Sequence, residues 1–187
     1  MSQRDLLRVC EILDLWPHAW WIAGGWAIDL HLSTQSRGHH DVDVAVLRRD
    51  QLNLQTHLAD WSFSKVANRS LAPWPAGEVL SPPVHEIHAV KGEEHLEFLL
   101  NDARADTWHF RRNNEISMPL AELTRRSASG IPYLCPQVVL LYKAKHPRPV
   151  DEDDFGRVLS RLKQSEREWL KDALEVCHPG HQWLRHL

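Results

Sequence analysis

The sequence predicts a mixed α/β fold, and three observations lead to this prediction. Asp41–Leu47 reads DVDVAVL, and its valines recur with the period of two that is typical of a β-strand. Residues 3–16 carry apolar side chains at helical spacing, and the pattern from about Pro136 onward is helical again. We therefore expect a core with a mixed β-sheet flanked by helices in residues 1–118. Residues 119–187 should form a connection and a small C-terminal helical subdomain.

The first third of the chain predicts alternating helices and strands. In the first helix Leu6, Cys10, Leu13 and Trp16 lie four and three residues apart on one face, and Pro17 ends it. The elements expected next are a buried strand at 20–23, a break at Gly24 and Gly25, a helix from Trp26 to Leu32, a polar loop at 33–40, and the strand at 41–47.

The rest of the chain predicts further strands and then helices. Expected in turn are a helix from Asp50 to about Ala59, a strand at 61–67, a proline-rich loop at 68–83, strands at 84–91 and 95–100, and a strand at 107–111. Beyond Pro136 the prolines at 147 and 149 separate one helix from the next. The acidic run Asp151–Asp154 is best explained as the favourable charge of a helix N-terminus.

The composition argues against several classes of binding partner and of protein. The 187 residues include 22 basic and 25 acidic side chains, a formal charge of -3, which argues against nucleic-acid binding through phosphate neutralisation. No apolar run approaches the roughly 18 residues that span a membrane, and the first residues lack the basic segment of a secretory signal. The three cysteines fit neither a disulfide framework nor a zinc motif. We expect a cytoplasmic protein with no membrane partner.

The predicted strand at 41–47 offers a metal site. Asp41 and Asp43 lie two residues apart, so a regular strand places both carboxylates on one face, about 6.6 Å apart along the strand. Magnesium prefers oxygen ligands and commonly takes one or two carboxylates together with substrate phosphates. Two such ions can stabilise the entering and leaving oxygens of a displacement at phosphorus. The same pattern also fits a solvated strand face.

The glycine pair offers a phosphate site. Glycine lets the backbone approach a phosphate closely, and a helix N-terminus behind it presents free N–H groups. Gly24, Gly25 and the amide of Trp26 can thus hold a triphosphate beside ions on Asp41 and Asp43. A glycine pair is more often a simple turn. The order strand, turn, helix, loop, strand makes the combination more specific than either part.

Several segments resemble a known family. WWIAGGWAIDLHL and QSRGHHDVDVAVLRRDQ are similar to nucleotidyltransferases of the polymerase-β-like superfamily, and within it to the aminoglycoside 2''-adenylyltransferase and lincosamide nucleotidyltransferase group. The resemblance is close over residues 20–52 and looser around HLEFLLND, TWHFRRN and LLYKAKHPRPVDEDDF. It implies a nucleotidyltransferase core that transfers a nucleoside monophosphate, usually AMP from ATP, to a hydroxyl of a small molecule while pyrophosphate leaves.

The resemblance also implies roles for individual residues. The strand aspartates of the family fall on Asp41 and Asp43, and its glycine-containing phosphate loop falls on Gly24 and Gly25. Its third carboxylate falls on Glu97, as a metal ligand or as the base for the attacking hydroxyl. Glu97 alternates with Leu96 and Phe98, so it is expected on the opposite strand face. Asp102 is the alternative third carboxylate, and the position of Glu97 also fits a solvated strand glutamate.

Other residues also allow a structural and a functional explanation. Arg37, in the QSR segment, either positions the loop or contacts phosphate. Lys143 is implied to face the nucleotide, in preference to Lys145, although a solvated lysine fits as well. Val150 replaces a lysine of the family pattern. His85, His88 and His95 do not form a zinc motif, because HEIH spaces its histidines three apart on an expected strand. Trp26, Trp74 and Trp108 are expected in the core rather than stacked on a base.

The function expected from these features is magnesium-dependent transfer of AMP from ATP to a small-molecule hydroxyl, with an aminoglycoside or lincosamide antibiotic as candidate acceptor. Two alternatives stay open: a protein-modifying adenylyltransferase similar to those of toxin–antitoxin pairs, and a catalytically silent nucleotide-binding module. The helical C-terminal part favours a small-molecule acceptor over the first alternative. The set Asp41, Asp43 and Glu97 argues against the second.

Overall fold

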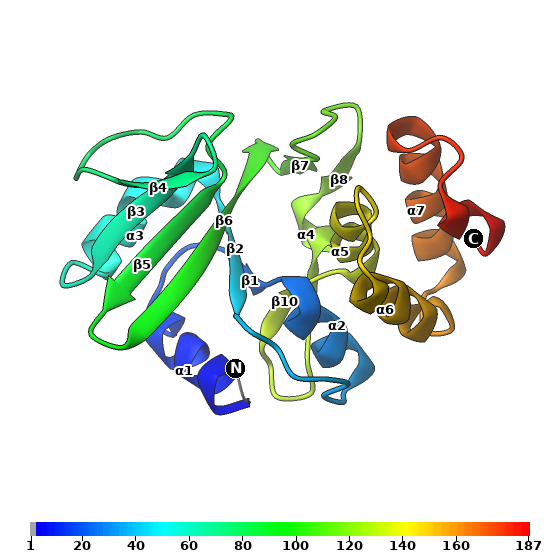
Figure 1. Ribbon diagram of the computed structural model, residues 1–187, viewed down its shortest axis with the longest axis horizontal. Coiled ribbons are helices and arrows are strands. Elements are labelled where there is room, and N and C mark those ends of the chain that lie inside the picture. The colour runs from blue at the N-terminus through cyan, green and yellow to red at the C-terminus, as the bar shows by residue number, and fades with distance from the viewer. Residues whose placement is uncertain (1–2) are drawn as a thin grey trace.

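The computed structural model describes residues 3–187, and within them a ten-stranded mixed sheet forms the centre of the molecule (Figure 1). The strands are β1 (Trp20–Ile22), β2 (Asp43–Leu47), β3 (Ser62–Ala67), β4 (Ser70–Pro73), β5 (Glu86–Lys91), β6 (Glu94–Arg104), β7 (Thr107–His109), β8 (Ser117–Pro119), β9 (Thr124–Arg126) and β10 (Pro132–Leu134). Their order is β4-β3-β5-β6-β2-β1-β10-β9, and β7 pairs with β6 and β8. β2 runs parallel to β6 and β1 parallel to β10, while the other pairs are antiparallel.

Some helices lie beside this sheet, and three helices follow its last strand in the chain. They are α1 (Gln3–Leu13), α2 (Gly24–Leu32), α3 (Gln51–His57), α4 (Leu120–Leu123), α5 (Pro136–Lys143), α6 (Pro149–Leu159) and α7 (Gln164–Cys177), with 3-10 turns η1 (Arg48–Asp50) and η2 (Gln182–Arg185). α5, α6 and α7 gather at the end of the molecule opposite β3, β4 and β5, and α2 packs against α5 and α6 (Figure 1). The mixed α/β fold with a helical C-terminal part is therefore confirmed.

Several element boundaries differ from the expected ones. α1 ends at Leu13, three residues early, although Trp16 beyond it is buried as expected of the apolar face. α2 begins at Gly24, so the glycine pair forms its first turn instead of preceding it. β2 begins at Asp43, which leaves Asp41 exposed in the segment before the strand. The strand expected at 107–111 ends at His109.

The sheet also has strands where a loop or a connection was expected. β4 lies inside the proline-rich segment 68–83 and pairs with β3, which makes it an edge strand. Proline is tolerated at the end of an edge strand, so the prolines did not exclude it. β9 and β10 lie beyond residue 118 and still join the sheet through β1. The connection expected after residue 118 thus contributes strands to the core.

The core combines both faces of the sheet with the apolar sides of the helices. Buried strand residues include Ile22, Val44 and Phe98, none of which is exposed at all. The tryptophans expected in the core are buried there: Trp26, Trp74 and Trp108 are each at most 4% exposed. Burying aromatic side chains of this size contributes a large share of the apolar stabilisation. In the described part of the chain no helix is long and apolar enough to cross a membrane.

Candidate active site

The contact between Gly24 and Asp43 is the centre of the site. β1 and β2 are antiparallel, so the end of β1 meets the start of β2, and the Ala23 N–H donates to the Asp43 carbonyl at 2.9 Å. Gly24 has φ +59, a backbone conformation that favours glycine, and a Cβ there would collide with Asp43 Oδ2. Only glycine therefore lets the first turn of α2 lie directly against this carboxylate.

Three carboxylates share one face of the sheet. Asp43 and Glu97 are partners in the parallel pair of β2 and β6, so their side chains are neighbours. On β5, His88 pairs with Glu97 and Glu86 pairs with Leu99, which places Glu86 on the same face. The exposed Asp41 precedes β2 on the chain. Asp41 and Asp43 were expected on one regular strand. Only Asp43 belongs to the strand, and Asp41 lies two residues before it.

The crowding of negative charge has an electrostatic signature. Burial, assisted by the charges of Asp41, Glu97 and Glu86, raises the pKa of Asp43 from 3.8 to about 7, against an opposing effect of Lys143. Burial raises the pKa of Glu97 as well, and the charge of Asp41 contributes. Carboxylates that are both desolvated and close to one another are poorly stabilised as anions. A divalent cation would reduce this repulsion between the carboxylates. The carboxylates of Asp41, Asp43 and Glu97 therefore suit a metal ion that prefers oxygen ligands.

The two candidates for the third carboxylate lie in different surroundings. Asp102 is five residues beyond Glu97 on β6, and this odd offset turns its side chain to the other face. There the Arg48 Nε lies 2.5 Å from Asp102 Oδ1, so the carboxylate is held in an ion pair. Glu97, not Asp102, is the neighbour of Asp43.

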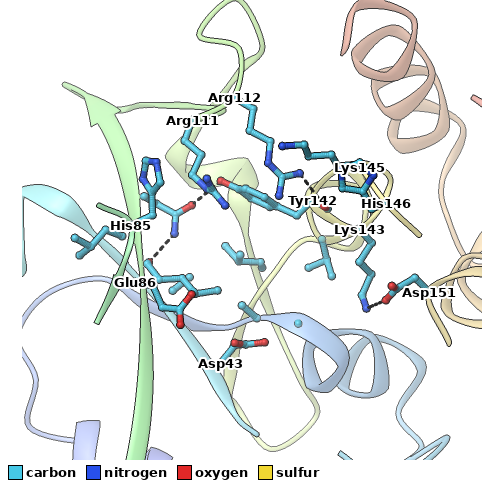
Figure 2. A pocket seen from close by; sticks show the side chains of 18 of the residues that line it. Asp43, His85, Glu86, Arg111, Arg112, Tyr142, Lys143, Lys145, His146 and Asp151 are labelled. Atoms are coloured by element: carbon cyan, nitrogen blue, oxygen red, sulfur yellow. Dashed lines mark hydrogen bonds and ion pairs between the residues drawn. The ribbon is translucent and has the colours of Figure 1, made fainter. Parts of the chain in front are cut away.

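A cavity of about 370 Å³ opens beside Asp43. Two of its acidic residues, Asp43 and Glu86, face Arg111, Arg112 and Lys145 across the open space (Figure 2). The third, Asp151, is held by Lys143 at another part of the wall. The other residues that line it are Ala23, Gly24, Ala45, His85, Leu99, Leu100, Asn101, Leu134, Val139, Tyr142, His146 and Arg148. One acidic and one basic wall suit a polyphosphate that carries divalent cations on one side.

Lys143 lines the cavity from the last turn of α5, and its ammonium group is engaged in ion pairs. Its Nζ lies 2.5 Å from Asp151 Oδ1 and 3.0 Å from Asp154 Oδ2, and both carboxylates are almost completely buried. Burial opposes ionisation of Asp151, yet hydrogen bonds from Arg148 and Lys143 hold the pKa of Asp151 well below its usual range. The acidic run therefore ties α6 to α5, in addition to placing Asp151 in the first turn of α6.

Arg37 lies behind the glycine pair and does not line the cavity. Its Nη2 is 3.5 Å from Asp154 Oδ2, and a Cβ on Gly25 would collide with the same guanidinium group. The loop that carries Arg37 is held by the buried Asp29, which accepts hydrogen bonds from the Ser36 amide and hydroxyl. The Arg37 guanidinium thus lies beside the first turn of α2 and contacts Asp154, and both of the roles expected for it stay predictions.

The side chain and the backbone amide of Trp26 have different surroundings. The indole is buried and packs on the His39 ring, with ring centroids 4.4 Å apart. His39 in turn lies with Nε2 2.5 Å from Asp29 Oδ2. The backbone amide of Trp26 belongs to the first turn of α2, where N–H groups have no partner within the helix.

Sequence reasoning missed most of the cavity wall. Glu86, Arg111 and Arg112 line the cavity without having been predicted as site residues, although both arginines lie in TWHFRRN, which resembles the family. Arg112 Nη1 donates to the Tyr142 carbonyl at 2.9 Å, which anchors this segment on α5. Of these three residues, only Glu86 has a position that the sequence could have indicated. It begins a strand in which polar and apolar residues alternate, so its side chain lies on the face opposite to that of Ile87.

Comparisons with known proteins show a partial family match and similar folds. Residues 5–74 match the family model described as aminoglycoside-2''-adenylyltransferase, a range that contains the close resemblance over residues 20–52. No curated protein sequence matches the chain significantly. The solved structure of the lincosamide antibiotic adenylyltransferase LnuA with lincomycin bound is similar, with a TM-score of 0.60 at 16% identity over 87% of this chain and 99% of that one.

Two further solved structures are similar along nearly their whole length. ANT(2'')-Ia in complex with adenylyl-2''-tobramycin has a TM-score of 0.62 at 16% identity, over 94% of this chain and 98% of that one. An antigenic nucleotidyltransferase-like protein from Paracoccidioides brasiliensis has a TM-score of 0.52 at 16% identity, over 100% and 93%. The chain therefore has the fold of the nucleotidyltransferases, and its residues 5–74 carry the sequence pattern of the aminoglycoside-2''-adenylyltransferase family.

Proposed function

We propose that this protein is a magnesium-dependent nucleotidyltransferase that transfers AMP from ATP to a hydroxyl group of a small molecule. The observation that carries the proposal is the approach of the Gly24 backbone to the Asp43 carboxylate at the edge of the cavity. This contact brings a phosphate-binding backbone and a metal-binding carboxylate together at one point. The match of residues 5–74 to an adenylyltransferase family model supports it.

Asp41, Asp43 and Glu97 are the residues that would hold Mg²⁺. They fit the group because they offer the oxygen ligands that Mg²⁺ prefers, and because burial together with the charges of Asp41 and Glu97 raises the pKa of Asp43 to about 7 when no cation is bound. Bound there, one or two Mg²⁺ ions would neutralise phosphate charge and favour ionisation of the acceptor hydroxyl.

The chain's own residues would perform the remaining tasks. The amides of Gly24, Gly25 and Trp26 would bind the triphosphate at the N-terminus of α2. The acceptor oxygen attacks the α-phosphorus in line, and the bond from that phosphorus to the bridging oxygen breaks, so pyrophosphate leaves. Glu97, whose pKa is raised by burial, would accept the proton of the attacking hydroxyl.

The basic wall would act on the leaving group. Arg111, Arg112 and Lys145 face the carboxylates across the cavity (Figure 2) and would stabilise the charge that develops on pyrophosphate. Lys143 would contribute from a fixed position, because Asp151 and Asp154 hold its ammonium group. Fixed charges need little reorganisation during the reaction, and this is the main electrostatic contribution of an enzyme site.

Aminoglycosides and lincosamides are the acceptors that we propose to test first. The solved ANT(2'')-Ia structure holds adenylyl-2''-tobramycin, and the LnuA structure holds lincomycin. Both families offer several hydroxyl groups on a compact scaffold. Antibiotic resistance would follow in a cell that produces enough of such an enzyme.

The test is a transfer assay with four nucleoside triphosphates, each labelled at the α-phosphate, Mg²⁺, and a panel of aminoglycosides and lincosamides. Mass spectrometry should find a small molecule heavier by one nucleoside monophosphate, with ATP as the preferred donor. Asp43→Asn should abolish transfer and Glu97→Gln should lower turnover more than nucleotide binding, whereas the exposed Asp106→Asn should change neither. Label that appears only on protein would indicate a protein adenylyltransferase, and bound but unreacted nucleotide a silent module.

A further inference from the structure

Two histidines gather beside Glu97 on the β5–β6 hairpin. His88 on β5 pairs with Glu97 on β6, and His95 lies two residues before Glu97 on the same strand face. The side-chain ligand atoms of His88, His95 and Glu97 all lie within 4.8 Å of one another. His88 Nδ1 is 2.8 Å from His95 Nε2 and 3.9 Å from Glu97 Oε1. Two imidazoles and a carboxylate thus converge on one small space.

A fourth residue orients one of the rings. Glu86 Oε1 lies 2.7 Å from His88 Nε2, so this nitrogen donates its proton to the carboxylate. The opposite nitrogen, Nδ1, then carries a lone pair that points toward His95 and Glu97. Histidines that ligate metals almost always donate their other N–H to a carboxylate, a carbonyl or water, and this contact fixes the tautomer that the metal needs.

The spacing suits a tetrahedral ion. Ligand bonds of about 2.0–2.1 Å in tetrahedral zinc sites place neighbouring ligand atoms roughly 3.3 Å apart. The observed separations of 2.8 Å and 3.9 Å lie on either side of this value. In the metal-free site His95 Nε2 donates its proton to His88 Nδ1. A cation bound by both nitrogens would replace this hydrogen bond, and the single proton of His95 would move from Nε2 to Nδ1. His95 is 39% exposed, so an ion can reach the site from solvent and water can complete its coordination.

We propose that His88, His95 and Glu97 form a binding site for a divalent transition-metal ion, Zn²⁺ in chemical class, with Glu86 as the residue that orients His88. Imidazole nitrogen favours zinc and similar ions over Mg²⁺. The site is thus distinct in chemistry from the carboxylates at Asp43. It shares Glu97 with them, so on the proposed function zinc would inhibit transfer by occupying the carboxylate that accepts the proton.

Binding is tested without any activity measurement. Co²⁺, a spectroscopic substitute for Zn²⁺, is titrated into the untagged full chain in the Asp43→Asn background, which weakens the carboxylate site. One Co²⁺ per chain should bind with visible absorption typical of tetrahedral nitrogen and oxygen ligands, and Zn²⁺ should displace it. His88→Ala or His95→Ala should weaken binding at least 10-fold, and Glu86→Gln about 10-fold to 100-fold. His186→Ala, an exposed histidine near the C-terminus, is the matched control and should bind as the parent does.

The proposal is overturned if no such absorption appears, or if the parent, His88→Ala and His95→Ala bind Co²⁺ with equal affinity. Thermal unfolding of each variant without metal shows whether it is folded, and His95 is partly exposed, so at least that substitution should leave the fold intact. Inhibition is measured separately: Zn²⁺ should lower turnover of the wild type more than that of His95→Ala. Failure of the transfer reaction itself would leave the binding result unaffected, so the two proposals fail independently.

Discussion

Asp43→Asn should stabilise the metal-free protein at pH 8, although it removes a residue placed at the centre of the site. Burial and the neighbouring Asp41, Glu97 and Glu86 raise the pKa of Asp43 from 3.8 to about 7. The folded state therefore binds more protons than the unfolded state between these two values, so the wild type loses stability as pH rises through this window. Asparagine resembles the protonated acid in shape and does not ionise, so the variant escapes this loss.

The size of the effect follows from the two pKa values. Between pH 5 and pH 8, a carboxyl with a pKa of about 7 in the fold and 3.8 in the unfolded chain loses about 2.6 kcal/mol of folding free energy. Solvent and relaxation reduce this value, and we expect about 1–2.5 kcal/mol, which is about 2–10 °C in Tm for a chain of this length.

The assay is thermal unfolding in chelator at pH 5 and pH 8. The difference in Tm between Asp43→Asn and the wild type should grow toward pH 8, whereas Asp106→Asn, an exposed aspartate in a turn, should follow the wild type. With Mg²⁺ and ATP added at pH 8 the order should reverse, because only the wild type binds them tightly. A difference in Tm that stays constant with pH would refute the reasoning about crowded carboxylates.

Three further outcomes are expected. Gly24→Ala should lower Tm and weaken ATP binding, because alanine disfavours φ +59 and its Cβ would displace Asp43, whereas Gly38→Ala meets no neighbour and should behave as the wild type; equal behaviour of the two would contradict the assigned contact. Lys143→Met should lower the free energy of unfolding by about 2–4 kcal/mol in urea, since it leaves Asp151 and Asp154 buried with less positive charge, and a neutral result would mean that the ion pairs contribute little. Mg²⁺ and ATP at 100 times Kd should stabilise the wild type by about 2.7 kcal/mol, and no rise in Tm at millimolar ATP would argue against a nucleotide site.

The sequence alone predicted the local elements around the site, though not their bounds. The alternation in Asp41–Leu47 predicts a strand because strand period is a local property, and the strand is present from Asp43 onward. The glycine pair was expected to precede a helix, and it forms the first turn of that helix. The segment 20–52, where the resemblance to the family is close, lies inside the family match over residues 5–74. The fold class followed from the order of these local patterns.

Tertiary structure decided which distant residues meet. The parallel pairing of β2 with β6 puts Glu97 beside Asp43. Asp102 lies on the same strand as Glu97, but its side chain points to the other face of the sheet and forms an ion pair with Arg48.

Arg111, Arg112 and Glu86 reach the cavity through β7, the following turn and β5, and β10 joins the sheet from beyond residue 118. Pairing between strands depends on contacts that are remote in the chain, and no periodicity within one segment records its partner. The chain thus encodes its catalytic candidates locally, whereas the walls around them exist only once the sheet has assembled.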